Sequence, residues 1–499
     1  MILILDLGTQ SFRATVVDRH GAKRFESSEP IESTLSGAIA EQDPDQWRMA
    51  LFGALDRLAT EGDLAKEIDY IAACGTLSGL VCLDENDSIL RPAILYSDRR
   101  PAVWLPHIES LPEFQPLARR SGWRVYSGDL LPQICYLRSQ FPAVYRRSAW
   151  LLDATGYLNY LLTGAATMDR YSTYTCYAEP SSEDLPEALL LRLGIDRRKL
   201  GRVIRIGESL GPLRPDLAGR YGFRQPEVIS VSYDSTAAYL GSPLAQPGEA
   251  LDISGTVTSF GVLTDCQVLD PERRIFSIPA GPDCWIVRGS TALSGGVLEW
   301  ARTELLDMEF ADLDRAVLAS PPGANGLVFL PFLAGARAPI WEPSASGVFF
   351  GLTSQTTKPD MARAVYEGIC FSLLHIVSVI GLSGVRVDSI LLGGGLARNG
   401  TLNQMKADMT GVALRALADV ELTTMGAASI VARCAGWLRA SGGDSFVKPL
   451  PPISPDWERN AIYRRQFGRY CALVSCLEPL FSQGDLPAAV RPDMVTSEI

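Results

Sequence analysis

Histidine is scarce in this chain, with only three residues of this type among 499: His20, His107 and His375. Chemistry that needs a histidine base therefore has few candidates. The sequence also lacks the pattern G-x-x-x-x-G-K followed by Ser or Thr, which excludes a P-loop nucleotide site at the level of motif. None of the ten cysteines forms a C-x-x-C pair, and no histidine lies at zinc-finger spacing from one, so a zinc module is not expected.

Long apolar runs and positive charge are scarce as well. The longest apolar stretch, residues 369–385, is interrupted by His375, serines and glycines; it is short for a membrane span and predicts a buried helix. Lys and Arg number 46 against 57 Asp and Glu, a net charge of −11, which argues against nucleic acid or an anionic membrane as a partner. The chain start lacks the basic region of a signal peptide, and the cysteines are typical of reduced thiols, so we expect a cytoplasmic protein.

What is present indicates a globular α/β protein of more than one domain. The hydrophobic fraction is 47% and the charged fraction 21%, and 499 residues exceed what one compact core usually holds. Residues 68–74 and 90–95 predict buried strands. Before them, Asp43 as a cap, Pro44 at the first helical position and Gln46 predict the start of a helix. Such alternation of strands and helices predicts α/β layers.

An internal repeat is the most useful feature of the chain. Residues 5–12 (LDLGTQSF) recur as residues 251–260 (LDISGTVTSF), and each copy continues into an apolar strand that ends in Asp. Chance is the alternative, because Asp, Gly and Thr are common in turns. We favour a duplication, since the order, the apolar context and the following strand all recur.

A duplication implies two similar lobes that face each other across a cleft. The offset between the copies, 247 residues from Gly8 to Gly255, is about half of the chain. Residues 241–248 contain Pro and Gly and form the obvious linker. We therefore expect an N-terminal lobe over residues 1–243 and a C-terminal lobe over residues 244–499, the latter ending in a helix from about Trp457 to Phe481.

Each copy of the repeat is suited to binding phosphate. A strand that ends in Asp-x-Gly-Thr, or nearly so, and enters a tight hairpin exposes several backbone N–H groups beside hydroxyls. Asp6 is placed to hold Mg²⁺, through water. Two such hairpins, one in each lobe, would grip a polyphosphate from both sides.

A third glycine turn, Gly393-Gly394-Gly395, lies between a predicted strand at residues 389–392 and a helix around residues 402–409. Glycines at such a turn let a ligand approach the backbone, and the helix N-terminus favours an anion. A dinucleotide fingerprint would need a small residue in place of Arg398, so we prefer a mononucleotide site. A simple packing turn is the alternative.

Two aspartates follow predicted strands. Asp234 comes after the strand 228–231 and heads a helix; it is either a helix N-cap or a general base whose ionised form the helix dipole favours. Asp98 follows the strand 90–95 and is either a ligand-binding residue or half of a surface Asp-Arg pair.

Residues 207–211 match G-x-S-x-G, the nucleophile elbow of serine hydrolases. That elbow must lead into a helix, whereas Pro212 and Pro215 follow at once, and His375 is the only histidine downstream. We therefore interpret the match at Ser209 as accidental, and a serine hydrolase is the weakest of the functional hypotheses.

These segments together resemble the FGGY carbohydrate kinases, and among them most the xylulokinases, from Asp6 to about Gly436. The most specific part is residues 347–352 (GVFFGL) followed by residues 360–367 (DMARAVYE), which are similar to the C-terminal signature of the family. Further segments that resemble family motifs are residues 41–44, 329–335, 393–395 and 425–428.

The resemblance implies two actin- and hexokinase-like lobes of the ribonuclease H-like type, closing over ATP-Mg²⁺ and a sugar. It implies that Asp234 is the general base and that Asp6 helps to place Mg²⁺. The residues implied in ATP binding are Gly8, Thr9, Gln10, Gly255, Thr256, Gly295, Gly394, Gly395 and Arg398. The residues implied in sugar binding are Thr76, Leu77, Ser78, Tyr96, Asp98 and Asp234.

The implied activity is the phosphorylation of a small sugar or polyol, with D-xylulose first. The sugar pocket departs from the xylulokinase pattern at two places. Ser78 occupies the position of a histidine in those enzymes, and residues 96–100 (YSDRR) replace their Trp-Asn-Asp-Gly-Arg. Ribulose, glycerol or an alditol are alternative acceptors, although the Gln-Arg-Glu motif of glycerol kinases is absent. A nucleotide-dependent sugar sensor without catalysis is the alternative from another class. The oligomeric state stays open, with a homodimer considered.

Overall fold

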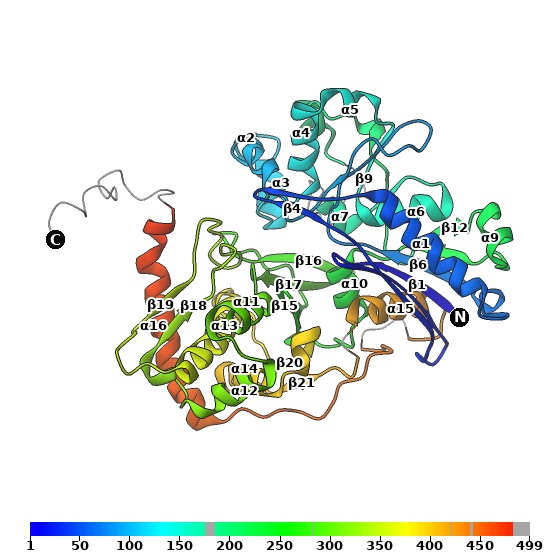
Figure 1. Cartoon of the computed structure of the whole chain (residues 1–499). Helices are drawn as coiled ribbons and strands as arrows, with labels where there is room; N and C mark the ends of the chain where they lie inside the picture. The colour runs from blue at the N-terminus through cyan, green and yellow to red at the C-terminus, as the bar shows by residue number, and fades with distance from the viewer. Residues whose placement is uncertain (175–184, 282, 420, 440–442, 483–499) are drawn as a thin grey trace. The chain divides into compact units, whose positions relative to one another are not determined.

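The structure is a computed structural model that describes residues 1–174, 185–281, 283–419, 421–439 and 443–482 (Figure 1). The chain divides into two compact units. The first comprises Met1–Gln246, Ser277–Asp283 and Glu421–Lys448, and the second comprises Pro247–Phe276, Cys284–Val420 and Pro449–Ile499. Each unit is a set of segments that pack together. The division into two functional lobes between residues 243 and 244 stays a prediction.

The first unit is built on a six-stranded sheet with the order β12-β13-β6-β1-β2-β3. Strand β1 pairs antiparallel with β2 and parallel with β6, while β13 continues the parallel side. The strands are β1 (Ile2–Leu7), β2 (Ser11–Val17), β3 (Lys23–Pro30), β6 (Tyr70–Cys74), β12 (Ser209–Pro212) and β13 (Glu227–Ile229). The predicted hairpin at the chain start is therefore confirmed.

The second unit repeats this arrangement. In its sheet, β17, β15, β14, β20 and β21 are neighbours in that order. Strand β14 pairs antiparallel with β15 and parallel with β20, as β1 does with β2 and β6. The strands are β14 (Glu249–Ser254), β15 (Thr258–Thr264), β17 (Cys284–Ser290), β20 (Ser389–Gly393) and β21 (Leu414–Ala416). The same strand order and directions around each hairpin confirm the duplication that the sequence repeat predicted.

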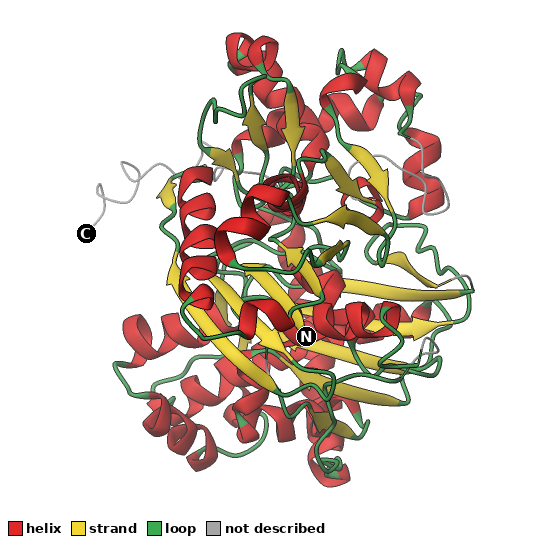
Figure 2. Cartoon of the chain, turned by 90° about the vertical axis from the view of Figure 1, so that its right-hand side faces the viewer, coloured by secondary structure: helices red, strands yellow, loops and turns green. Residues whose placement is uncertain are grey.

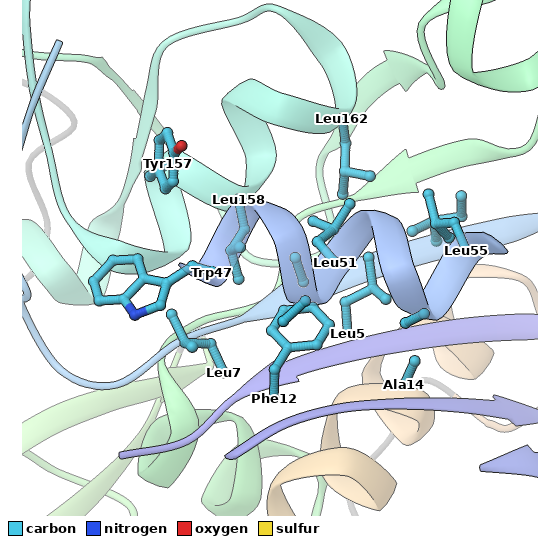
Figure 3. Packing of buried hydrophobic residues seen from close by; sticks show 14 of the residues in the cluster. Leu5, Leu7, Phe12, Ala14, Trp47, Leu51, Leu55, Tyr157, Leu158 and Leu162 are labelled. Carbon is cyan, nitrogen blue, oxygen red and sulfur yellow. The ribbon is translucent and has the colours of Figure 1, made fainter. Parts of the chain in front are cut away.

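Helix α1 (Pro44–Ala59) shows how the sequence builds the core of the first unit. Asp43 caps it by accepting the amide hydrogen of Asp45, and Pro44 occupies its first turn. Trp47, Leu51 and Leu55 are fully buried against strands β1 and β2 and helix α6 (Ala154–Thr163), as Figure 3 shows. The Gln46 side chain accepts from the Glu32 amide, so the cap of this helix is Asp43 alone.

The remaining elements surround these sheets (Figure 2). In the first unit the helices are α2 (Leu105–Ser110), α3 (Gln115–Ser121), α4 (Leu130–Gln140), α5 (Pro142–Arg147), α7 (Arg170–Tyr174), α8 (Glu187–Arg192), α9 (Pro215–Tyr221), α10 (Asp234–Gly241) and α15 (Leu422–Cys434). The short strands are β4 (Thr34–Ser36), β5 (Ile39–Gln42), β7 (Val81–Leu83), β8 (Ala93–Ile94), β9 (Trp150–Leu152), β10 (Thr167–Asp169) and β11 (Arg202–Ile204). Strand β16 (Phe276–Gly281) is the edge strand of the sheet that contains β17. In the second unit the elements are α11 (Gly295–Trp300), α12 (Phe310–Ala319), β18 (Val328–Leu330), β19 (Val348–Phe350), α13 (Lys358–Leu382), α14 (Gly400–Thr410) and α16 (Trp457–Phe481).

Helix α13 is the core helix of the second unit. Among the described residues it is the one helix long and apolar enough to cross a membrane by length and composition, but 67% of its apolar window is buried inside the protein. A capping box of Thr357 and Asp360 starts this helix, and aromatic residues of α16 pack against it. The buried helix predicted around residues 369–385 is confirmed.

Candidate active site

Asp6 lies near the end of β1, opposite Arg13 in the pairing with β2 and beside Cys74 in the pairing with β6. Its carboxylate is buried; Oδ2 lies 3.7 Å from the Arg13 guanidinium and accepts the Thr424 hydroxyl hydrogen at 3.3 Å. Burial raises the pKa of the Asp6 carboxyl, and the charge of Arg13 acts in the opposite direction. Among the described residues no Lys, Arg or His side chain lies within hydrogen-bond distance of the Asp6 carboxylate. Its oxygens can therefore accept hydrogen bonds from the water shell of a metal ion.

The turn after Asp6 is tight. The Gly8 amide donates to the Ser11 carbonyl at 2.9 Å, and a Cβ on Gly8 would lie 3.2 Å from that oxygen. The Thr9 carbonyl accepts from the Gln42 side chain at 2.7 Å, and Gln10 is exposed at the tip. The predicted phosphate-binding residues of this hairpin therefore lie directly beside Asp6.

Asp234 is the first residue of α10, with Tyr233 as the N-cap. Its amide donates to the Gly75 carbonyl at 2.9 Å, and its carboxylate accepts from the Ser235 amide at 2.5 Å. The side chain is half-buried. The alternative that Asp234 is an N-cap is therefore wrong: its carboxylate lies inside the first helical turn, where the dipole favours the ionised form.

The loop that follows β6 carries three of the predicted sugar-binding residues. Gly75 links it to Asp234, and Thr76 and Ser78 are buried while Leu77 is half-buried. Ser78 has a φ of 60°, and its buried hydroxyl has no hydrogen-bond partner within the described part of the chain. An unpaired buried hydroxyl is costly, so a ligand that supplies a partner would remove this cost. The structure thus brings this loop and Asp234 together.

A buried acidic pair supports the turn that precedes Asp234. The Ser232 hydroxyl donates to Asp169 at 3.0 Å, and Asp169 also accepts from the Ser172 hydroxyl at 2.7 Å. Asp153, the N-cap of α6, accepts from the Gly156 amide. Burial, followed by the charge of Asp169, raises the pKa of Asp153 to about 7. Neither acid was predicted from the sequence, because neither lies in a recognisable motif.

Asp98 is fully buried, and both of its oxygens are engaged. It accepts from the Ala40 amide at 2.9 Å, from the Arg100 amide at 2.9 Å and from the Arg100 guanidinium at 2.6 to 3.1 Å. Glu41 also contacts this guanidinium. The Asp-Arg pair considered as the alternative is present, although buried. Tyr96 is half-buried in the same segment, and its role and that of Asp98 toward a sugar stay predictions.

Three glycine turns of the second unit converge. The Gly295 amide donates to the Gly255 carbonyl at 2.9 Å, and a Cβ on Gly295 would lie 2.6 Å from that oxygen. Gly394 has a φ of 78°, and a Cβ there would lie 2.5 Å from the Ser254 carbonyl oxygen. The Ser294 amide donates to the Thr256 carbonyl. Only glycine fits at positions 295 and 394, and at Gly255 nothing lies within 4 Å of an added Cβ, so the three turns form a compact backbone cradle of the kind that a nucleotide needs.

Gly395 and Arg398 follow Gly394 in a 3₁₀ turn, η6 (Gly395–Arg398), rather than in the helix itself. Helix α14 starts at Gly400, with Asn399 as its cap. The helix predicted around residues 402–409 is therefore α14, and the 3₁₀ turn occupies the residues between Gly394 and the cap of this helix. Both Gly395 and the Arg398 side chain are exposed.

The second copy of the repeat differs from the first at its aspartate. Asp252 lies three residues before Gly255, whereas Asp6 lies two before Gly8; it is fully buried and pairs with the Lys406 ammonium at 2.6 Å. Because this ammonium already balances the charge of Asp252, the magnesium role fits Asp6 and not Asp252. The sequence analysis missed Lys406, because it lies 154 residues from its partner. Arg13 was missed too, although the hairpin register alone places it opposite Asp6.

The described residues contain no group of three or more His, Cys, Asp and Glu side chains that could hold a metal ion. Mg²⁺ does not need one, since it is commonly bound through one or two carboxylates together with substrate phosphates and water. Asp6 and its turn fit this mode. Ser209 is the first residue of strand β12 and donates to Glu227, and helix α9 begins only at Pro215, so Ser209 does not sit on a strand-to-helix turn, which agrees with an accidental elbow match.

Comparison with known proteins gives consistent matches over the whole length. The N-terminal domain of the FGGY family of carbohydrate kinases matches residues 1–241, and its C-terminal domain matches residues 252–435. The xylulose kinase of Escherichia coli strain K12 is 27% identical over 499 residues, covering 97% of this chain and 100% of that protein.

Solved structures share the fold. A ligand-bound xylulose kinase from Lactobacillus acidophilus superposes with a TM-score of 0.89 at 22% identity, covering 97% of this chain and 100% of that one. A gluconate kinase from the same organism superposes with a TM-score of 0.90 at 22% identity, over 97% and 99%. The two-domain α/β fold with actin- and hexokinase-like lobes is thereby confirmed.

Proposed function

Because the chain belongs to the FGGY family of carbohydrate kinases, and so is a carbohydrate kinase, we propose that it phosphorylates D-xylulose with ATP and that Asp234 is the general base. One observation carries the assignment of the base. The Asp234 amide donates to the Gly75 carbonyl, so the backbone that carries this carboxylate is held next to the loop of Thr76 and Ser78.

Asp234 would accept the proton of the attacking sugar hydroxyl. Its carboxylate already receives the Ser235 amide hydrogen within the first turn of α10, which favours the ionised form and fixes its direction. Asp169 holds Ser232 two residues earlier, so the turn that carries the base is braced from the protein interior. Transfer of the phosphoryl group itself depends on positioning more than on covalent chemistry by the protein.

The glycine turns of the second unit would hold the nucleotide. Gly255, Gly295 and Gly394 leave a backbone surface without side chains, and we assign Thr256, Gly395 and Arg398 to the same site. Asp6, Gly8, Thr9 and Gln10 are the residues that we assign to Mg²⁺ and the phosphates in the first unit. When bound, Mg²⁺ would neutralise phosphate charge.

The choice of D-xylulose rests on relatives and not on a contact in this protein. The relative from Escherichia coli is named xylulose kinase, but a structural neighbour is named gluconate kinase. The unpaired Ser78 hydroxyl replaces the histidine expected in xylulokinases, and such polar positions control discrimination strongly. Another pentulose or polyol is therefore the second candidate acceptor. We propose a cytoplasmic location; a homodimer stays a prediction.

The test is an ADP-release assay over D-xylulose, D-ribulose, their alditols, glycerol and gluconate, run on wild type and Asp234→Asn. We expect Asp234→Asn to lower kcat by about 10²- to 10⁴-fold, because a general base contributes that much, while the affinity for an ATP analogue is kept. Asp216→Asn, at an exposed aspartate in the first turn of α9, is the matched control. Full activity of Asp234→Asn would refute the role of this residue. Sugar-induced protection without turnover by wild type would favour the sensor.

A further inference from the structure

A buried ion pair lies behind the glycine turns of the second unit. The Lys406 ammonium of α14, 2% exposed, donates to Asp252 at 2.6 Å and to the Ser254 hydroxyl oxygen at 2.9 Å. The Ser254 hydroxyl in turn donates to the other Asp252 oxygen at 2.6 Å. Lysine is seldom buried to this degree unless it is paired.

The polar contacts continue from Ser254 to the turn of Gly295. The Thr258 hydroxyl oxygen lies 2.8 Å from the Ser254 hydroxyl oxygen and 2.8 Å from the Ser294 hydroxyl oxygen, and its one hydrogen can serve either neighbour. Thr291 lies 3.1 Å from the Ser294 hydroxyl and accepts the Thr258 amide hydrogen at 3.0 Å. All of these residues are buried. The chain of contacts therefore links the residue before Gly255 to the residue before Gly295.

The same pair also reaches the third turn. Gly394 packs on the Ser254 carbonyl so closely that a Cβ would lie 2.5 Å from the oxygen. Lys406 belongs to α14, the helix that follows the Gly394 turn, so its ammonium ties this helix to strand β14. One ammonium group thus connects the elements that bear all three glycine turns.

Stability alone is a weak reason for such a pair. A buried ion pair costs much desolvation, and well-packed apolar residues are often at least as stable in its place. The Lys406 ammonium contacts Asp252 and Ser254 at the same time, so the pair holds these two residues of β14 in a defined position relative to α14.

We propose that Lys406 is a positioning residue for nucleotide binding: with Asp252 it holds Ser254 and thereby fixes the Gly255, Gly295 and Gly394 turns in the geometry that receives the phosphates of a nucleoside triphosphate. This inference rests on the proposed nucleotide site of the second unit. It also gives Asp252 a role distinct from that of Asp6, since Asp252 supports the backbone of the turns while Asp6 remains open to a metal ion.

The test removes both charges together, because Lys406→Met alone would leave a buried carboxylate without a partner. The affinity of Asp252→Asn/Lys406→Met for a non-hydrolysable ATP analogue with Mg²⁺ is measured by calorimetric titration, and the KM values for ATP and for the sugar are measured separately. We expect the analogue to bind about tenfold more weakly and the KM for ATP to rise in step, with the sugar KM unchanged, because small misplacements of binding groups are costly.

A second buried pair provides the control. Arg363 and Glu367 of α13 lie 2.8 Å apart, and their contacts run to Val317, Ser320 and Tyr463 rather than to the glycine turns. Arg363→Met/Glu367→Gln should lower the melting temperature and leave the affinity for the analogue unchanged. Wild-type affinity in a folded Asp252→Asn/Lys406→Met protein would overturn the proposal.

Thr258→Val covers the case in which the double variant does not fold. It replaces one hydroxyl of the chain of contacts by a methyl group of similar size, and we expect it to weaken binding of the analogue in the same direction. Unchanged binding in this variant would also overturn the proposal. Failure of wild type to bind the analogue would instead refute the proposed nucleotide site.

Discussion

Asp153 shows how a single buried carboxyl gives the protein a measurable pH dependence. It is 1% exposed, lies near the buried Asp169, and burial and that neighbour raise its pKa to about 7. In the unfolded chain an aspartate titrates near its ordinary value of about 4. Between these two values the native protein holds a proton that the unfolded chain has released. The contribution of this carboxyl to the free energy of unfolding therefore falls as the pH rises from about 4 to about 7, and it stays constant above about pH 7.

Asp153→Asn should remove this dependence while it keeps the helix cap, because asparagine caps helices as well as aspartate does. We expect the variant to be more stable than wild type at pH 8, by on the order of 2–4 kcal/mol, and the difference to shrink at pH 5. Urea unfolding at the two pH values measures this. Asp43→Asn, at the exposed cap of α1, is the control and should shift little between them. A difference for Asp153→Asn that is equal at both pH values would contradict the expectation.

Side-chain roles were only partly predictable at this scale. The repeat predicted an aspartate before each turn, but the strand pairings show that the two differ by one residue in register: Asp6 pairs with Arg13, one pair from the end of its hairpin, and Asp252 pairs with Phe260, two pairs from the end. It could not predict that Asp252 is neutralised, because its partner Lys406 comes from a helix 154 residues later. The unpaired hydroxyl of Ser78 was equally invisible, since it follows from the packing of the loop against α6. Local sequence patterns predict which residues lie near a turn, whereas their partners depend on the tertiary fold.

Among the elements, the turn after β20 offers a direct test of the backbone cradle. Gly394 and Gly395 are neighbours in sequence, but they differ in what a side chain would meet. A Cβ on Gly394 would collide with the Ser254 carbonyl, and its φ of 78° is unfavourable for other residues. At Gly395 nothing lies within 4 Å of the added atom.

Gly394→Ala should therefore destabilise the protein by about 1–3 kcal/mol and weaken binding of an ATP analogue, because the turn must shift away from β14. Gly395→Ala is the matched control, and it should leave the free energy of unfolding within about 0.5 kcal/mol of wild type. Thermal and urea unfolding of both variants, followed by titration of the analogue, measure these effects. Equal destabilisation by the two substitutions would contradict the structure of this turn.

Elements with strong periodicity were predictable, and elements defined by tertiary pairing were not. The terminal helix expected from Trp457 to Phe481 is α16 with the same bounds, and the strand expected at residues 68–74 is β6, from Tyr70 to Cys74. The strand expected at residues 90–95 shrinks to Ala93–Ile94, because β5 offers it only two residues to pair with. The 3₁₀ turn between Gly394 and α14 carries no local signal that separates it from a helix start.

On the scale of the whole molecule, the duplication was the part of the fold most accessible from sequence. Each hairpin repeats with the same neighbours, antiparallel on one side and parallel on the other. Helix α15 follows no such pattern. It lies near the end of the chain, yet it packs with β1 and α10 in the first unit. Contacts between residues some 400 positions apart leave no periodic signal in a single sequence.

The proposed sugar site lies in the first unit and the glycine turns proposed for the nucleotide lie in the second, so each ligand should protect its own set of amides first. A ligand at 100 times its dissociation constant stabilises the state that binds it by about 2.7 kcal/mol, which slows the opening of the bound region. In hydrogen-exchange measurements, we therefore expect a non-hydrolysable ATP analogue with Mg²⁺ to protect first the amides around Gly255, Gly295 and Gly394. D-Xylulose should protect first the amides around residues 75–79 and around Asp234.

Variants at each proposed site test whether the two sets of amides are protected independently. Gly394→Ala should lose the protection by the analogue and retain the protection by the sugar, because the Gly75 contact of Asp234 belongs to the other unit. Asp234→Asn should keep the protection by the analogue, since the glycine turns of the second unit do not include Asp234. If each ligand protected both sets of amides equally, even in these variants, the two sites could not be assigned to separate units. If D-xylulose protected neither set while gluconate or D-ribulose did, the kinase assignment would stand and the substrate would change.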